Sequence, residues 1–255
     1  GMRTVISTNG TLIDRRAARR IRDAGFSYVG VSLDGIGATN DRFRGRNGAF
    51  EEALAGIRHC TEAGVRTGLR FTINQRNQQD LEAAIDLMVA EDIPRCCVYH
   101  LVYSGRGSRL IEEDLSHEET RRALDTIFRK ALELHGRGLD KELLTVDNHA
   151  DGVYLYQYVR PRVPERAGEV LQMLQWNGGN SSGIGIACVD DQGNVHADQF
   201  WRHHSFGNVR ERSFSEIWMD TSDPIMAGLK DRKPLIKGRC AQCRYLQICN
   251  ANFRV

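Results

Sequence analysis

The stretch that decides the fold runs from residue 28 to residue 73 and reads YVGVSLDGIGATNDRFRGRNGAFEEALAGIRHCTEAGVRTGLRFTI. It begins and ends with short apolar runs that are rich in β-branched residues. Between them, Phe50, Leu54 and Ile57 recur at helical spacing, and charged residues occupy the opposite face. A strand, a helix and a second strand in this order indicate a right-handed βαβ crossover, which joins two parallel strands.

The same alternation extends over the first two-thirds of the chain. Further strand-like runs cover 4–8, 96–103 and 142–147, and further helical stretches cover 11–26, 77–92 and 117–138. These segments make about five strand–helix units, which is too few for a closed eight-stranded barrel. The sequence therefore predicts an α/β fold whose parallel sheet forms part of an open barrel.

The composition argues against several classes of protein. The 35 basic and 33 acidic residues leave a formal net charge of +2, so bulk charge indicates neither a nucleic-acid partner nor a membrane surface. No apolar run approaches the roughly 20 residues that span a bilayer, and we expect no secretory signal. The seven cysteines are odd in number and are not spaced as a disulfide framework, which favours metal ligation in a reducing cytoplasm.

Polar side chains follow the predicted strands at the edge where parallel α/β sheets bind ligands. These residues are Asn9, Ser32, Asp34, Arg70, Asn74 and Arg106. Taken singly, such a polar residue can also be explained by a role in a turn, because pairs such as Asn9-Gly10 and Asp34-Gly35 are common in turns. Because four strand ends in a row carry polar groups, the set favours a ligand site at this edge.

A second sequence pattern begins at about Ile184. Short strands flank an Asp-Gln-Gly-Asn turn, which is a hairpin signal. Ser213, with Glu216 three residues later, predicts a capping box at the start of a short helix. A stretch rich in Gly, Ser and Asn at 174–183 separates the two patterns. We therefore predict a barrel domain over 1–178 and a small β-hairpin and cysteine-rich module over 179–255.

Three cysteines near the end of the chain are spaced as metal ligands. Cys240 and Cys243, with two residues between them, can reach one metal, and Cys249 can return to it. A tetrahedral zinc site or a four-iron cluster needs a fourth ligand, and Cys188 in the hairpin is the natural candidate. Cysteine spacing does not distinguish zinc from an iron–sulfur cluster. The remaining cysteines are interpreted as buried small apolar side chains, and these are Cys60, Cys96 and Cys97.

A set of motifs resembles a known enzyme family. ISTNGTLI (6–13), VSLDGIGATNDRFRG (31–45), FTINQRN (71–77), HLVYSGRG (100–107) and CAQCRYLQICNANFRV (240–255) are together similar to radical S-adenosylmethionine (radical SAM) enzymes with a C-terminal SPASM or twitch module. HLVYSGRG and FWRHHSFGNVRERSFSEIW (200–218) look like the NirJ-type proteins of haem d1 biosynthesis and their relatives in the alternative haem pathway. The resemblance covers essentially the whole chain.

The resemblance implies a partial (β/α)6 barrel with a four-iron cluster on a Cys-x3-Cys-x2-Cys loop. That cluster passes an electron, supplied by ferredoxin or flavodoxin, to S-adenosylmethionine, and the radical that is released abstracts hydrogen from a substrate. No Cys-x3-Cys-x2-Cys occurs in this sequence. We therefore expect an N-terminally truncated barrel without its first strand–helix units, which is itself inactive. Its open sheet edge is a surface that a homodimer could cover.

The resemblance also assigns roles to strand-end residues. The family's contacts to S-adenosylmethionine correspond to Asn9, Ser32, Asp34, Arg70 and Asn74. Arg106 lies where the substrate approaches, and a guanidinium pairs bidentately with a propionate carboxylate. A surface role for Arg106 is equally open.

The cysteine-rich module departs from the full SPASM pattern. Asp198 stands where a family cysteine would be, and only four cysteines remain in the module. The resemblance therefore implies a single auxiliary [4Fe-4S] cluster on Cys188, Cys240, Cys243 and Cys249, with zinc as the alternative.

For the full-length enzyme, the resemblance implies modification of propionate side chains on a sirohaem-derived tetrapyrrole, in the biosynthesis of haem d1 or a related haem. Two other functions are open. One is a peptide-modifying SPASM maturase. The other is a non-catalytic scaffold that binds zinc or an iron–sulfur cluster.

Overall fold

A computed structural model describes residues 2–251, apart from the side chain of Arg106. The chain divides into two compact units. The first unit comprises Gly1–Leu101 and Leu110–Asp147, and the second comprises Val102–Arg109 and Asn148–Val255. This division by compactness places 148–178 with the C-terminal residues. The predicted domain boundary at 178/179 stays a prediction.

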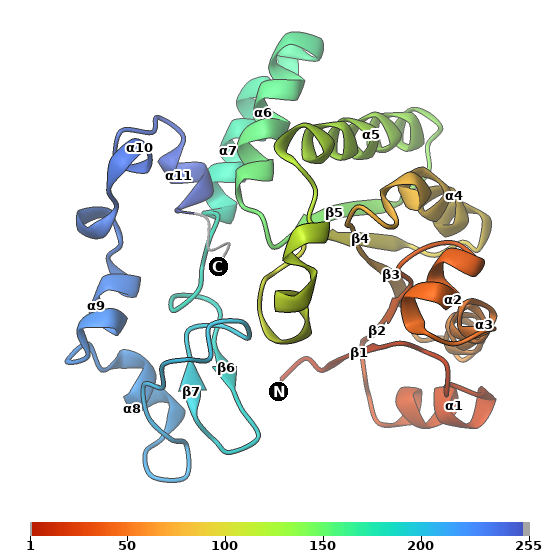
Figure 1. The fold of residues 1–255 in the computed structure, drawn as a ribbon, viewed down its shortest axis with the longest axis horizontal. Helices are drawn as coiled ribbons and strands as arrows, with labels where there is room; N and C mark the ends of the chain where they lie inside the picture. The colour runs from red at the N-terminus through yellow and green to blue at the C-terminus, as the bar shows by residue number, and fades with distance from the viewer. Residues whose placement is uncertain (1, 252–255) are drawn as a thin grey trace. The chain divides into compact units, whose positions relative to one another are not determined.

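The first unit is an α/β layer built on five parallel strands (Figure 1). The strands are β1 (Val5–Thr8), β2 (Tyr28–Ser32), β3 (Thr67–Thr72), β4 (Arg95–Tyr99) and β5 (Glu142–Val146), and they lie in chain order. The connecting helices are α1 (Arg15–Asp23), α2 (Ala38–Arg44), α3 (Ala49–Glu62), α4 (Leu81–Ala90) and α5 (His117–Gly136), with a 3-10 turn η1 at Gln78–Asp80. The predicted α/β class and parallel sheet are confirmed.

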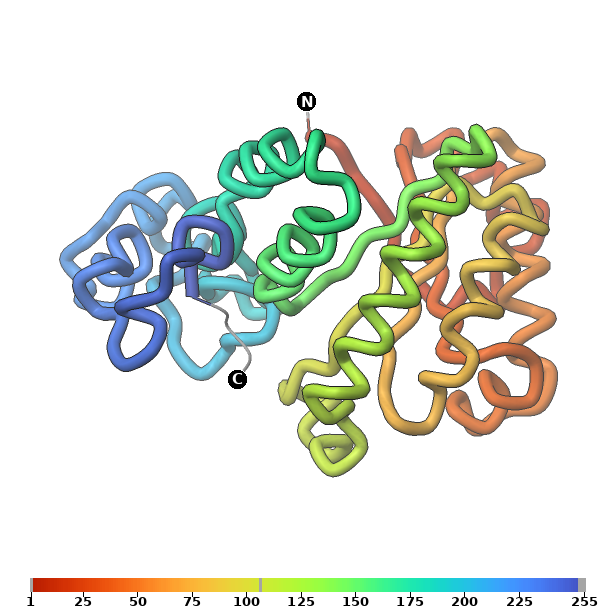
Figure 2. The backbone as a smooth tube through the Cα atoms, turned by 90° about the horizontal axis from the view of Figure 1, so that it is seen from above, coloured from red at the N-terminus to blue at the C-terminus, as the bar shows by residue number. Residues whose placement is uncertain are grey.

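All the crossovers of this sheet cover the same face. Each strand pairs with the next in the chain, so right-handed connections step in one direction and place their helices on one side. Figure 2 shows the helices of this unit along one side of the strands. The core between them holds Val29 and Phe71 from the sheet and Ile85 from α4, each almost fully buried. Burying one such side chain contributes about 1.5–3 kcal/mol.

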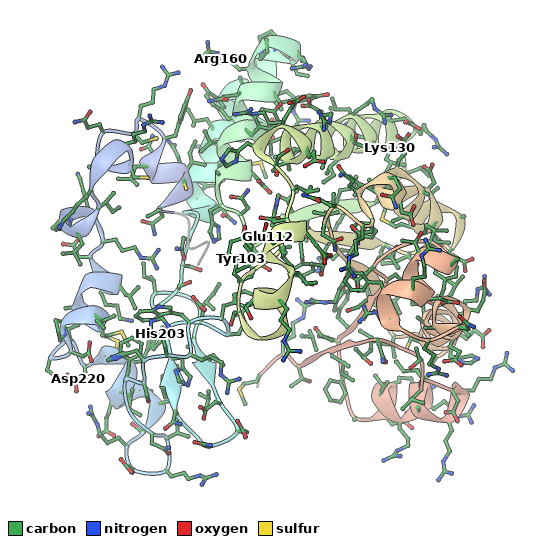
Figure 3. The ribbon with its side chains drawn as sticks, viewed as in Figure 1. Tyr103, Glu112, Lys130, Arg160, His203 and Asp220 are labelled. Carbon is green, nitrogen blue, oxygen red and sulfur yellow. The ribbon has the colours of Figure 1, made fainter. Side chains whose placement is uncertain are left out.

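Local sequence signals set the ends of these helices. Asp14 caps α1, because its Oδ1 accepts a hydrogen bond from the Ala17 amide at 2.7 Å. Ser116 and Glu119 form a capping box at the start of α5. Further along α5, Lys130 (labelled in Figure 3) is buried and its Nζ donates to Asp86 Oδ1 of α4 at 2.7 Å. This ion pair joins two neighbouring helices on the covered face.

The second unit is built from short elements. They are η2 (Gly105–Glu113), α6 (Ala150–Arg162), η3 (Pro164–Arg166), α7 (Ala167–Asn177), β6 (Cys188–Val189), β7 (Val195–His196), α8 (Phe214–Met219), α9 (Pro224–Lys230), η4 (Lys233–Leu235), α10 (Gly238–Ala241) and α11 (Leu246–Cys249), and η2 extends past Arg109 into the first unit. Strands β6 and β7 pair antiparallel, so the predicted hairpin is confirmed. The predicted capping box of Ser213 and Glu216 begins α8. Among the helices described, none is long and apolar enough to cross a membrane.

Candidate functional site

The carboxyl end of the sheet brings Ser32 and Arg70 together. They are register partners on neighbouring strands β2 and β3, so their side chains stand side by side on the face that the helices leave uncovered. The Arg70 guanidinium lies 4.2 Å from the centre of the Tyr99 ring and donates a hydrogen bond to the Tyr99 hydroxyl. Burial raises the pKa of Tyr99 to about 12, against the opposing effect of Arg70.

A glycine allows Arg70 to take this position. A Cβ added at Gly30 would lie 2.8 Å from Arg70 Cδ, so the arginine stem crosses the strand where a side chain is missing. Tyr99 then holds the far end of the guanidinium. The result is a half-buried cation beside the Ser32 hydroxyl. This donor pair is suited to binding a carboxylate.

Asp34 is engaged within the protein. Its side chain is 5% exposed, Oδ1 accepts from the Thr72 amide at 3.0 Å, and Oδ2 pairs with Arg44. Burial raises the pKa of Asp34, although Arg44 opposes the shift. The carboxylate thus ties the ends of β2 and β3 to α2. Its predicted contact with S-adenosylmethionine stays a prediction.

Asn74 and Asn9 both take part in turns. Asn74 is fully buried, its Oδ1 accepts from the Arg76 amide at 2.9 Å and its Nδ2 donates to the Thr72 carbonyl. Asn9 is exposed, and its Oδ1 accepts from the Thr11 amide at 3.3 Å. Turn chemistry therefore accounts for both positions. Their predicted cofactor contacts are not tested, and the Arg106 prediction falls on a side chain outside those described.

The same sheet face carries residues that the sequence reasoning did not identify. The Tyr28 ring crosses β3 at Gly68, where a Cβ would collide with its hydroxyl, and the Arg95 guanidinium lies 5.5 Å from the ring centre. Arg95 also pairs with Glu142 of β5. Burial raises the pKa of Tyr28 to about 12. In β4, Arg95 and Tyr99 lie an even number of positions apart and so share a face, and this spacing could have revealed the polar side chains there.

The cysteines separate by unit. Cys188, Cys240, Cys243 and Cys249 all lie in the second unit, two of them exposed and two half-buried. The other three are buried in the first unit, as expected of small apolar side chains, and they are Cys60, Cys96 and Cys97. Burial raises the pKa of the Cys96 thiol to about 12. These three buried thiols therefore stay protonated and are poor ligands.

The four candidate ligands do not converge on one atom. Among the residues described, no group of three or more His, Cys, Asp or Glu side chains lies close enough to hold a single metal ion. Cys240 and Cys243 share a turn, in which the Cys243 amide donates to the Cys240 carbonyl at 3.1 Å. The donor chemistry, four cysteine side chains on short segments of one unit, fits a sulfur-ligated iron cluster. Their role as ligands stays a prediction.

A cavity of about 440 Å³ adjoins this turn. Its wall includes Cys243, the basic side chains of Lys233 and Arg244, and the apolar side chains of Ile236 and Leu246. Lys233 and Arg244 therefore place positive charge on the wall that also carries the Cys243 thiol.

The hairpin that carries Cys188 is held by a buried ion pair. Cys188 is the register partner of His196, whose Nε2 lies 3.1 Å from Asp190 Oδ2 and whose Nδ1 lies 2.6 Å from the His204 carbonyl oxygen. The imidazole thus lies between two oxygen atoms, one on a carboxylate and one on a backbone carbonyl. The His196 hydrogen bond keeps the pKa of Asp190 well below its usual range.

Asp198 has a structural place in the loop that follows. Its Oδ1 accepts from the amides of Phe200 and Trp201, both at 2.8 Å, in a tight turn. The loop continues with His203, whose ring lies edge-on to Trp201 with centroids 4.5 Å apart (Figure 3). Ser104 donates to the Phe200 carbonyl and so ties the loop to η2.

Comparison with known proteins defines the class. The model of the radical SAM superfamily matches residues 1–88, and that of the SPASM iron–sulfur cluster-binding domain matches residues 180–244. The chain therefore carries a radical SAM domain and a SPASM domain. These domains imply S-adenosylmethionine binding and iron–sulfur clusters.

Within this class the chain is similar to enzymes named for haem biosynthesis. It is 61% identical to Fe-coproporphyrin III synthase of Methanosarcina barkeri over 100% of the chain and 65% of that protein. It is 42% identical to pre-heme d1 synthase of Dinoroseobacter shibae over 98% of the chain and 62% of that protein. The chain thus spans slightly less than two-thirds of these relatives. The resemblance to NirJ-type proteins is confirmed.

Solved structures agree on the fold. Streptococcus suis SuiB matches with a TM-score of 0.73 at 15% identity, over 99% of this chain and 56% of that one. The anSMEcpe enzyme with bound AdoMet and Cp18Cys peptide matches with a TM-score of 0.69 at 16% identity, over 97% of this chain and 64% of that one. At this level of identity the likeness concerns architecture only.

Proposed function

We propose that this chain is the barrel and SPASM portion of a radical SAM enzyme that modifies propionate side chains of a sirohaem-derived tetrapyrrole. The observation that carries the proposal is the 61% identity, along the whole chain, to a protein named Fe-coproporphyrin III synthase. The 42% identity to pre-heme d1 synthase supports the same substrate class. Both names refer to tetrapyrroles that carry acidic side chains.

In this proposal, Ser32 and Arg70 bind the carboxylate of S-adenosylmethionine. A guanidinium matches a carboxylate bidentately, and the adjacent hydroxyl donates a further hydrogen bond. Tyr99 orients the guanidinium, and Asp34 holds the two strand ends at a fixed spacing. When bound and reduced by a cluster, S-adenosylmethionine supplies a carbon radical that removes hydrogen from an unactivated C–H bond. No side-chain base can remove so weakly acidic a proton.

These 255 residues contain no Cys-x3-Cys-x2-Cys. We therefore propose that the chain by itself does not cleave S-adenosylmethionine. The proposal includes an auxiliary [4Fe-4S] cluster on Cys188, Cys240, Cys243 and Cys249, with zinc as the alternative metal. It also includes ferredoxin or flavodoxin as electron donor, and a homodimer through the outer edge of β1.

A peptide-modifying maturase is the second candidate. Its support is 26% identity to mycofactocin maturase MftC of Mycolicibacterium smegmatis over 95% of the chain. The tetrapyrrole relatives are much more similar in sequence, so we favour the tetrapyrrole. The third candidate, a non-catalytic metal-binding scaffold, differs from both in predicting no binding of S-adenosylmethionine or substrate.

A substrate-binding titration tests the proposal. Iron coproporphyrin III is added to the anaerobically purified chain, and the porphyrin absorption band is followed. We expect a saturable shift with a one-to-one end point, because relatives at 61% and 42% identity are named for tetrapyrroles. Saturable binding of a leader peptide without any porphyrin shift would favour the maturase instead.

Metal analysis tests the cluster. We expect about four irons and four sulfides per chain in the wild type. Cys243→Ala should lose them, whereas Cys97→Ala should retain them because Cys97 lies buried in the other unit. One zinc per chain under iron-replete conditions would reject the cluster and favour the scaffold.

Calorimetric titration with S-adenosylmethionine tests the proposed carboxylate pair. Arg70→Lys replaces the planar guanidinium, which can donate two parallel hydrogen bonds, with a single ammonium group. Losing a hydrogen bond to a charged group costs about 1.5–3 kcal/mol, so the affinity for S-adenosylmethionine should fall about 10- to 100-fold. Arg76→Lys is the matched control, since Arg76 is exposed and pairs with Glu113. Equal affinities for the two variants would remove Arg70 from the binding site.

A further inference from the structure

Arg232 is a half-buried cation that binds only backbone oxygens. Its Nη1 donates to the carbonyls of Asn180 and Asn250, both at 3.1 Å, and its Nη2 donates to the carbonyl of Ser182. No carboxylate pairs with Arg232 in the described part of the chain. Burial lowers the pKa of Arg232. One guanidinium thus joins segments about 70 residues apart in sequence.

Two asparagines complete this set of contacts. The Asn250 Nδ2 donates to the Asn180 carbonyl at 2.6 Å, and the Asn180 Nδ2 donates to the Ala251 carbonyl at 2.7 Å. The Asn180 amide donates to the carbonyl of Cys249 at 3.0 Å. We name the side chains of Arg232, Asn180 and Asn250, with the backbone groups they bind, the Arg232 node.

The Arg232 node fixes the backbone on both sides of Cys249, one of the candidate metal ligands. Gly179 lies so close to the chain that an added Cβ would be less than 3.0 Å from the carbonyl oxygens of Ile248 and Cys249. Asn250 is held in the left-handed region, with φ at 51°. Asparagine adopts this conformation more readily than other non-glycine residues and ends α11 in it, while its side chain binds the Asn180 carbonyl. Hydrogen bonds within the protein therefore place Cys249.

We propose that Arg232 is a positioning residue for the metal centre: it fixes Cys249 against the start of the SPASM domain. Cys240 and Cys243, by contrast, are exposed and lie in a short turn. A pre-placed Cys249 leaves those two residues to order on metal binding, which lowers the entropic cost of assembly. Only arginine has a planar fork able to bind several carbonyls at once. The inference rests on the proposed ligand set.

The test compares Arg232→Lys with Arg239→Lys, an exposed arginine of the same segment. Hydrogen exchange of the Asn180 amide in metal-free protein is the first readout, because that amide binds Cys249. We expect exchange about tenfold faster in Arg232→Lys, the equivalent of one lost hydrogen bond, and unchanged in Arg239→Lys. Iron content after anaerobic desalting is the second readout. It should fall to about half or less of the wild-type value in Arg232→Lys alone.

The outcomes separate this inference from the proposed function. If Arg232→Lys keeps both the wild-type exchange rate of the Asn180 amide and the wild-type iron content, the positioning role is overturned. If Cys243→Ala also keeps its iron, the ligand set itself is wrong. If Arg232→Lys fails to fold, Asn250→Gly is the second variant. It removes the 2.6 Å hydrogen bond to the Asn180 carbonyl, and glycine adopts the positive φ without strain. A loss of iron in this variant is therefore caused by the loss of a contact of the Arg232 node. Wild-type iron in that variant would likewise reject the inference.

Discussion

Replacing Gly179 with alanine should destabilise the second unit strongly. The φ of Gly179 is +67°, and a left-handed conformation costs a non-glycine residue about 1–2 kcal/mol. The new Cβ would also meet the carbonyl oxygens of Ile248 and Cys249, which are backbone atoms that move only with the chain. Relieving this overlap costs about 1–3 kcal/mol as overpacking. Breaking the Asn180–Cys249 hydrogen bond costs about 0.5–1.5 kcal/mol more.

We therefore expect Gly179→Ala to lower the free energy of unfolding by about 3–6 kcal/mol. Gly178→Ala is the matched control, because Gly178 has a φ of +72° and no atom within 4 Å of an added Cβ. Gly178→Ala should lower the free energy of unfolding by only about 1–2 kcal/mol, which is the cost of the left-handed backbone conformation for alanine.

Urea unfolding followed by tryptophan fluorescence measures this difference. All three tryptophans, Trp176, Trp201 and Trp218, lie in the second unit, so their emission reports that unit. For an m-value of about 2 kcal/mol/M, the midpoint of Gly179→Ala should fall by about 1.5–3 M. Equal midpoints for the Gly178 and Gly179 variants would refute the close approach to Cys249 and, with it, the basis of the Arg232 node.

Two further predictions concern stability. The pKa of Asp190 is lower in the folded protein than its ordinary value of 3.8, because it accepts hydrogen bonds from His196 and nearby amides. Its stabilisation is therefore present above about pH 4 and is lost as pH falls through the folded-state pKa. Tryptophan-detected urea midpoints between pH 2.5 and 6 should fall less steeply with acid in Asp190→Asn than in the wild type; parallel curves would contradict the pair. Phe71→Ala, in the core of the first unit at 1% exposure, should cost about 3–5 kcal/mol in urea unfolding followed by far-ultraviolet circular dichroism. A loss below about 1 kcal/mol would place Phe71 outside a tightly packed core.

The strand–helix repeat was readable because it is local. Phe50, Leu54 and Ile57 mark the buried face of α3 by spacing alone, and the β-branched runs mark the strands. The hairpin and its capping box were readable for the same reason. The spacing of Cys240 and Cys243 marks them as candidate metal ligands because it involves neighbouring residues, and that role stays a prediction.

The polar residues at the strand ends show where this reasoning stops. Ser32 and Arg70 were identified and do stand side by side. Asp34 and Asn74 were identified on the same grounds, yet Asp34 binds the Thr72 amide and the Arg44 side chain, and Asn74 binds backbone groups. Sequence position marks the edge of a sheet, but it does not say whether a polar group there faces a ligand or closes a turn.

The amino-acid sequence by itself determined the fold class, the hairpin module and the close spacing of Cys240, Cys243 and Cys249, because each depends on residues near one another in the chain. Only the tertiary structure decided that Arg70 lies across Gly30 onto Tyr99, and that Arg232 joins Asn180 to Asn250. These contacts link residues 18 to 70 positions apart. Their existence depends on how strands and loops pack in space, and no periodicity in the chain encodes that.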